Sequence, residues 1–169
     1  LFEKTRLTDL GLAGGVAYNS VMNGKILLNT PFRRVFVQPA AGDSGTALGV
    51  CFHIYNQIIN RPREFVMEGA YTGPEFSDQE IRSELERSGL EYETYTDQEL
   101  TKRAARDIAD SKIVGWFQGR MEFGPRALGN RSILVDPRRA EMKNILNCRI
   151  KKREPFRPFA PSIFEERVG

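Results

Sequence analysis

The sequence predicts an α/β fold in its first part and an α+β fold in its second. Two successive units of a buried strand, a glycine-rich turn and a helix run from 9 to 25 and from 35 to 60. Such alternation is typical of α/β domains, whose ligands bind beyond the carboxyl ends of the strands. Farther along, two polar helices lead into a strand, a loop and a second strand at 113–135. We expect two domains, 1–68 and 69–169, joined by a connector rich in proline and glycine.

The first unit turns at the glycine pair Gly14 and Gly15, where an apolar strand gives way to a helix expected at 16–25. Asn23 and Gly24 would end that helix, as a turn or a C-terminal cap. Backbone N–H groups at the positive end of a helix suit the phosphates of a nucleotide. A tight turn that needs glycine only for steric reasons is the alternative.

The second unit follows a short strand at 35–38 with a turn in which three glycines bracket polar residues. This turn can cap the helix that follows, cradle a phosphate and direct the Asp43 carboxylate at a metal ion. Spacing alone supports capping of the helix by Asp43 equally well. The three glycines are Gly42, Gly45 and Gly49.

Three arginines and one carboxylate occupy the loop between the last two predicted strands, and we call residues 118–131 the arginine loop. An arginine fork matches phosphate and carboxylate oxygens and stays charged at any working pH. Glycines let backbone N–H groups approach a bound oxyanion closely. We therefore interpret the loop as an anion pocket. Its charged residues are Arg120, Glu122, Arg126 and Arg131.

Apolar residues are interleaved with these charges. A solvated basic hairpin is the alternative interpretation, and we rank it second because solvated loops rarely carry so much apolar surface. The interleaved residues are Trp116, Phe117, Phe123 and Leu128.

Two capping boxes, at 77–80 and 96–99, predict helices that end at Gly89 and near Ala109. Between these helices the alternating pattern of 90–95 predicts a strand.

Strands are expected at 113–117 and 132–135, on either side of the arginine loop. An amphipathic helix is expected at 138–150, and a proline-stiffened basic segment follows it at 151–163. The inner face of the helix would consist of Met142, Ile145 and Leu146.

The net charge of +3 hides an asymmetry along the chain. Residues 1–110 hold 12 Lys and Arg against 16 Asp and Glu, whereas residues 111–169 hold 13 against 6. Anion binding should therefore be concentrated in the last third. The basic residues lie among glycines and predicted strands, so a small phosphorylated ligand is favoured over nucleic acid.

The remaining composition excludes several classes of protein. The only histidine is His53, and we assign it no role. With no other histidine, this chain cannot form a His-based metal site or a Ser-His triad by itself. Cys51 and Cys148 are expected to be structural thiols in a reducing cytoplasm. No apolar run approaches the roughly 20 residues that cross a bilayer. We expect a fragment truncated at both ends, from a cytoplasmic protein for which a homo-oligomer is compatible with the sequence.

Three stretches, at 12–25, 37–49 and 115–138, together resemble the O-carbamoyltransferase family of nodulation-factor and antibiotic-tailoring enzymes. The third stretch, with its continuation at 153–162, is highly specific to that family. The first two are shared more widely with actin-like and sugar-kinase-like ATPases.

The resemblance implies two lobes and a biosynthetic reaction. Residues 1–68 would end an actin-like ATPase lobe that binds ATP and a divalent metal, expected to be iron, with Mg²⁺ also compatible alongside the nucleotide. Residues 69–169 would form much of a domain similar to threonylcarbamoyl-adenylate synthases. The implied reaction activates carbamoyl phosphate as carbamoyl adenylate and transfers the carbamoyl group to a hydroxyl of a small-molecule or sugar acceptor.

The resemblance also implies roles for individual residues. The nucleotide would contact Gly14, Gly15, Asn19, Gly42 and Gly45, and the metal would contact Asp43. Carbamoyl phosphate or its adenylate would contact Arg120, Arg126, Asn130, Arg131 and Arg157. The catalytic residues would be Arg120, Arg126 and Arg131, which act by charge stabilisation and positioning. The metal-binding histidines of such enzymes are not in this chain, so we expect the fragment alone to be inactive.

Two alternatives remain open at this point. A threonylcarbamoyl-adenylate enzyme of tRNA modification shares both lobe types and would use threonine and bicarbonate. A non-catalytic RNA-binding module would account for the basic last third and its aromatic residues.

Overall fold

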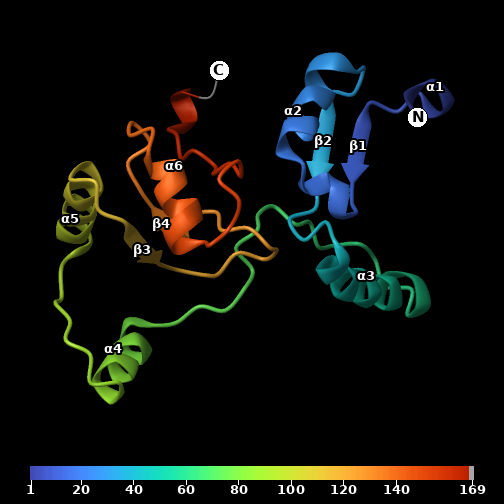
Figure 1. Cartoon of the computed structure of the whole chain (residues 1–169). Coiled ribbons are helices and arrows are strands. Elements are labelled where there is room, and N and C mark those ends of the chain that lie inside the picture. Colours follow the sequence, from blue (N-terminus) through green and yellow to red (C-terminus); the bar gives the residue numbers. More distant parts are fainter. Residues whose placement is uncertain (168–169) are drawn as a thin grey trace. The chain divides into compact units, whose positions relative to one another are not determined.

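The computed structural model describes residues 1–167, which form two compact units (Figure 1). The first unit consists of Leu1–Phe76 and Gln118–Asn130. The second consists of Ser77–Phe117 and the described residues from Arg131 onward. These units differ from the predicted domain ranges, because most of the arginine loop packs with the N-terminal residues. The domain ranges of the intact protein stay a prediction.

The first unit is built on two parallel strands, β1 (Asp9–Leu12) and β2 (Arg34–Val37). Asp9 lies opposite Arg34 and Leu12 opposite Val37, and the Asp9 and Arg34 side chains form an ion pair. A short helix, α1 (Phe2–Thr5), precedes β1. Parallel strands need a crossover connection, and α2 (Ser20–Asn29) supplies it. The α/β prediction is therefore confirmed for this unit, whereas its assignment to an actin-like lobe is not tested.

The crossover helix differs from the predicted one at both ends. A 3-10 turn, η1 (Gly15–Tyr18), comes first, and Asn19 then caps α2 by accepting a hydrogen bond from the Met22 N–H at 3.0 Å. Asn23 and Gly24 lie inside α2 and do not end it. The Asn23 side chain instead donates to the Ala17 carbonyl at 2.7 Å, so it anchors the helix to η1.

The second strand leads through a 3-10 turn, η2 (Asp43–Gly45), into α3 (Thr46–His53). A π-helical turn, η3 (Ile54–Ile58), extends α3, which confirms the prediction of helix to about residue 60. Residues 61–76 form neither helix nor strand.

The second unit begins with α4 (Asp78–Arg87) and α5 (Asp97–Ala109), and both predicted capping boxes are present. The strand predicted at 90–95 is wrong, because this segment is extended but has no strand partner. Its Tyr92 hydroxyl bonds to the Glu86 carboxylate at 3.1 Å. Alternation of side chains alone does not make a strand without a partner to complete the hydrogen bonds.

Two antiparallel strands, β3 (Val114–Phe117) and β4 (Arg131–Leu134), follow in the second unit, as predicted to within a residue. The next helix is shorter than predicted: α6 (Met142–Ile145) starts four residues late and continues as a π-helical turn, η4 (Leu146–Ile150). Met142 and Leu146 are buried as expected. A 3-10 turn, η5 (Glu165–Arg167), comes last among the described residues.

The fully buried Asn147 ties the proline-rich segment to η4. Its side-chain amide donates to the carbonyls of Pro155 at 3.1 Å and Arg157 at 3.0 Å. Its carbonyl oxygen accepts from Arg153 Nε at 2.8 Å. A side chain with no exposed surface and three hydrogen bonds fixes the backbone on either side of Phe156.

Few side chains are buried in either unit. The buried apolar residues are mostly alanines, and both cysteines are free and exposed, so the prediction of structural thiols is not supported by their burial. Within residues 1–167, no helix has the length and apolar character that a bilayer span requires.

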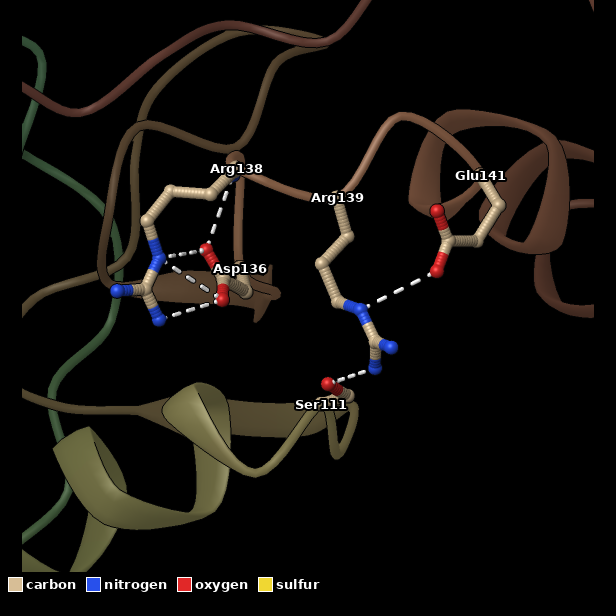
Figure 2. A network of polar contacts seen from close by, with 5 residues as sticks. All are labelled: Ser111, Asp136, Arg138, Arg139 and Glu141. Atoms are coloured by element: carbon tan, nitrogen blue, oxygen red, sulfur yellow. Dashed lines mark hydrogen bonds and ion pairs between the residues drawn. The ribbon is translucent and has the colours of Figure 1, made fainter.

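A buried carboxylate, Asp136, closes the turn after β4 (Figure 2). The Arg138 side chain folds back over it, with Nε at 2.8 Å from Oδ1 and Nη2 at 2.7 Å from Oδ2. The Arg138 N–H also donates to Oδ1 at 2.9 Å. Arg139 points the other way, toward Ser111 and Glu141 (Figure 2). This turn, with Pro137 at its centre, explains why α6 does not begin at Arg138.

The Asp136 turn predicts a stability change in acid. The side-chain bonds from Arg138, and then its N–H, lower the pKa of Asp136 to about 2. The unfolded value is about 3.9, so this carboxylate stabilises the fold above about pH 4 and loses its contribution as pH falls toward 2. At pH 5, Asp136→Asn should have a lower free energy of unfolding than the wild type. As pH falls from about 4 toward 2, this free energy should decrease less in Asp136→Asn than in the wild type. Urea unfolding, followed by the fluorescence of Trp116 in β3, measures the free energy of unfolding at each pH. If this free energy falls equally in the wild type and in Asp136→Asn, Asp136 is not the group responsible.

Candidate functional site

Two glycine turns lie side by side in the first unit. We call residues 14–18 the first glycine turn and residues 39–45 the second. The Gly14 N–H donates to the Ala41 carbonyl at 2.6 Å, and the Gly42 N–H donates to the Tyr18 hydroxyl at 2.8 Å. The turns follow β1 and β2, so their contact results from the parallel pairing of those strands.

The arginine loop reaches both glycine turns. A Cβ built on Gly124 would lie 2.5 Å from the Pro39 carbonyl oxygen, so the loop backbone touches the start of the second turn. Arg126 Nη2 donates to the Tyr18 carbonyl of the first turn. The Arg126 guanidinium also lies 5.9 Å from the centre of the Tyr18 ring. The three stretches singled out in the sequence therefore meet in one compact unit.

The segment 70–74 supports the other edge of the loop. The Phe123 N–H donates to the Ala70 carbonyl at 2.6 Å, and Met121 N–H to the Pro74 carbonyl at 2.9 Å. The Tyr71 hydroxyl donates to the Leu128 carbonyl at 2.8 Å. These three hydrogen bonds fix the loop between residues 70–74 and the glycine turns.

A buried carboxylate, Glu122, organises the loop from within. Its Oε1 accepts from the N–H groups of Leu128 and Asn130, both at 2.7 Å. The Asn130 side-chain amide in turn donates to the Arg120 carbonyl at 2.8 Å. Bonds from N–H groups to a buried carboxylate are among the stronger hydrogen bonds, so Glu122 sets the loop's conformation.

The predicted anion-binding residues divide between the two units. Arg120, Arg126 and Asn130 belong to the first unit, and Arg131 and Arg157 belong to the second. Arg126 is exposed, and the Arg120 guanidinium lies 3.8 Å from the Glu75 carboxylate.

In the second unit, the Arg131 guanidinium stacks 3.5 Å from the centre of the Phe117 ring, and Arg157 Nε bonds to Glu154 at 2.9 Å. Phe117 is 53% exposed and Leu128 is 47% exposed. Trp116 and Phe123 are half-buried, so two of the four interleaved apolar residues are less buried than an anion pocket would require.

The predicted nucleotide residues have visible structural roles. Gly14 has a φ of 98°, which glycine adopts readily, and a Cβ on Gly45 would lie 2.0 Å from the Ala40 carbonyl oxygen. A Cβ on Gly42 would lie 3.0 Å from the Tyr18 ring. Asn19 caps α2. Gly15 differs, because it is exposed and no atom lies within 4 Å of its Cβ position.

Asp43 is exposed and opens η2, but its side chain caps neither η2 nor α3, so the N-cap interpretation is wrong. Across residues 1–167, no cluster of three or more His, Cys, Asp or Glu residues could hold a metal. The donors present do not make a metal site by themselves, and the role of Asp43 as a ligand stays a prediction.

Two residues of the site received no role from the sequence. Tyr18 joins both glycine turns to the loop, and Glu122 holds the loop together. The signal for Glu122 was its place as the only carboxylate among three arginines. No local pattern pointed to Tyr18, because its contacts are with residues 24 and 108 positions away in the sequence.

The approach of Gly124 to Pro39 predicts a specific effect of substitution. Gly124→Ala should destabilise the protein through both its φ of 120° and the clash with the Pro39 carbonyl. Gly129→Ala is the matched control, since its φ is 117° and no atom lies within 4 Å of its Cβ position. The clash should add about 1–3 kcal/mol to the loss, measured by urea unfolding. Equal losses would show that the loop does not press against the second glycine turn.

The chain is similar to known proteins over most of its length. The family models named carbamoyltransferase N-terminus and carbamoyltransferase C-terminus match residues 1–52 and 105–169. Nodulation protein NolNO of Sinorhizobium fredii is 49% identical over 97% of the chain and 24% of its own length. An uncharacterized protein of Synechocystis is 45% identical over 100% of the chain and 28% of its own length.

The 3'-hydroxymethylcephem-O-carbamoyltransferase of Streptomyces clavuligerus is 33% identical over 96% of the chain and 29% of its own length. The chain thus spans between 24% and 29% of the length of these relatives. With one family's N- and C-terminal models matched at the two ends of the chain, it belongs to the carbamoyltransferase family.

Proposed function

We propose that the intact protein is an ATP-dependent O-carbamoyltransferase. It would activate carbamoyl phosphate as carbamoyl adenylate and transfer the carbamoyl group to a hydroxyl of a small-molecule or sugar acceptor. The observation that carries this proposal is the contact of the arginine loop with both glycine turns inside one unit. The name of the cephem relative, which specifies O-carbamoyl transfer to a hydroxymethyl compound, supports the same class of reaction.

The glycine turns would bind ATP. The N–H groups of Gly14 and Gly42 already bond within the protein, so these two glycines would shape the turns and leave the phosphates to other groups. Gly15 has no packing neighbour that requires glycine, and close approach of a phosphate to its backbone gives a reason for it. Gly45 would keep the second turn close to Ala40, and Asn19 would act through its cap of α2.

The arginine loop would bind carbamoyl phosphate. Arg126 has five N–H donors, and its bond to Tyr18 uses only one of its nitrogens. Arg120 pairs with Glu75 at 3.8 Å, and exposed pairs of this kind are weak. Both guanidiniums could therefore hold phosphate oxygens. Asn130, Arg131 and Arg157 stay predicted ligands of carbamoyl phosphate.

The chemistry needs water as well as both phosphate compounds. Water would release inorganic phosphate from carbamoyl phosphate, and a carbamate oxygen would then displace pyrophosphate from the α-phosphorus of ATP. The acceptor hydroxyl would attack the carbamoyl carbon, with AMP as the leaving group. Arg120, Arg126 and Arg131 would stabilise the negative charge on the transferred groups. Asp43 would contribute one ligand to a divalent metal, iron or Mg²⁺, whose other ligands lie outside these residues.

The reaction predicts a strict dependence of ATP cleavage on the second substrate. The intact protein should release pyrophosphate from ATP only when carbamoyl phosphate is present, as measured by a coupled pyrophosphate assay. ATP cleavage that ignores carbamoyl phosphate would contradict the proposal. Cleavage that requires threonine and bicarbonate instead would identify a threonylcarbamoyl-adenylate enzyme.

Arg126→Ala should weaken carbamoyl phosphate binding. A charged hydrogen bond of about 1.5–3 kcal/mol corresponds to a loss of roughly ten- to a hundredfold in affinity, measured by calorimetry on the intact protein. Arg87→Ala is the control, because Arg87 is an exposed arginine of α4 that pairs with Glu84. Unchanged affinity in Arg126→Ala would show that the loop is structural.

A further inference from the structure

Tyr18 lies at the junction of the three segments that form the candidate site. We infer that Tyr18 is a positioning residue that couples ATP binding at the glycine turns to the placement of Arg126 for carbamoyl phosphate. The inference rests on the proposed function and assigns a role to a residue for which the sequence predicted none.

The side chain of Tyr18 holds the second glycine turn. Its hydroxyl accepts the Gly42 N–H at 2.8 Å, and its ring lies 3.0 Å from the position a Gly42 Cβ would take. Gly42 precedes η2, which opens with Asp43, so a shift of this turn moves the Tyr18 ring. Because the ring is half-buried and in close contact with Gly42, the two cannot move independently.

The backbone and the ring face of Tyr18 hold Arg126. The Tyr18 carbonyl accepts a hydrogen bond from Arg126 Nη2, and the guanidinium lies 5.9 Å from the ring centre. A guanidinium within about 6 Å of an aromatic ring is attracted to it. One residue of the first glycine turn therefore sets the direction of an exposed cation of the loop.

Tyr18 is also fixed to the crossover helix. It ends η1, and the next residue, Asn19, caps α2. The Gly14 N–H ties the start of the same turn to Ala41. ATP that orders the two turns would thus order Tyr18, and Tyr18 would order the Arg126 side chain before carbamoyl phosphate arrives.

Such an arrangement produces a measurable coupling. Binding that has already immobilised Tyr18 and Arg126 removes part of the ordering cost for the second ligand. By linkage, carbamoyl phosphate must then strengthen ATP binding by the same factor. A purely structural Tyr18 would affect stability or both affinities, but it would leave this factor unchanged.

The test compares two tyrosine-to-phenylalanine variants of the intact protein. Tyr18→Phe removes the bond to the Gly42 N–H and keeps the ring and the carbonyl that Arg126 uses. Tyr71→Phe removes a bond of the same kind, from the hydroxyl to the Leu128 carbonyl, that does not involve either glycine turn. Calorimetry gives the affinity for carbamoyl phosphate with and without a non-hydrolysable ATP analogue, and the converse titration gives the same factor for the analogue.

The wild type and Tyr71→Phe should share one coupling factor, and Tyr18→Phe should reduce it about two- to tenfold, as expected for one hydrogen bond. Thermal unfolding establishes that Tyr18→Phe remains folded. If Tyr18→Phe is unfolded, Gly42→Ala replaces it. A Cβ at residue 42 would lie 3.0 Å from the Tyr18 ring, so it should displace the ring and reduce the factor in the same way.

Two results would overturn the inference while leaving the proposed function in place. One is a wild type that binds both ligands without coupling, and the other is an unchanged factor in the tested variant. A wild type that binds neither ligand would instead refute the proposed function, and the inference with it.

Discussion

The candidate site depends on the close contact between the arginine loop and the glycine turns. At Gly124 the loop backbone reaches the Pro39 carbonyl, and only a residue without a Cβ fits there. Two residues later, Arg126 reaches the Tyr18 carbonyl. Without this contact the first unit would contain two glycine turns and a separate basic loop. With it, predicted ligand-binding residues more than 100 positions apart in the sequence lie in one unit.

Local sequence signals predicted the local structure well. The capping boxes at Ser77 and Thr96 were confirmed because each depends on residues three positions apart. The α/β architecture of the first unit was also predicted, and the parallel β1–β2 pair agrees with it. The strand predicted at 90–95 failed because alternation describes one strand, whereas a sheet requires a partner that no local pattern specifies.

Long-range contacts explain most of what the sequence did not predict about the site. Arg126 was identified as an anion ligand from its residue type, but its contact with Tyr18 depends on how the loop folds back across the unit. Gly42 and Gly45 were interpreted as phosphate-binding glycines, yet both also have neighbours that exclude a side chain. A steric reason for glycine therefore exists at these positions whether or not a ligand binds there, and of the four glycines assigned to the nucleotide only Gly15 lacks one.

The basic residues of the last third are not equally available to an anion. Some of these basic residues are already paired with nearby carboxylates, as at Arg138 with Asp136 and Arg157 with Glu154. These pairs are not equivalent. Asp136 is buried and holds Arg138 with several hydrogen bonds, so a ligand would have to break a turn to take that arginine. Glu154 is exposed, and exposed pairs contribute little. A phosphate dianion could therefore replace Glu154 at Arg157 at small cost, which leaves Arg157 available and commits Arg138 to the fold.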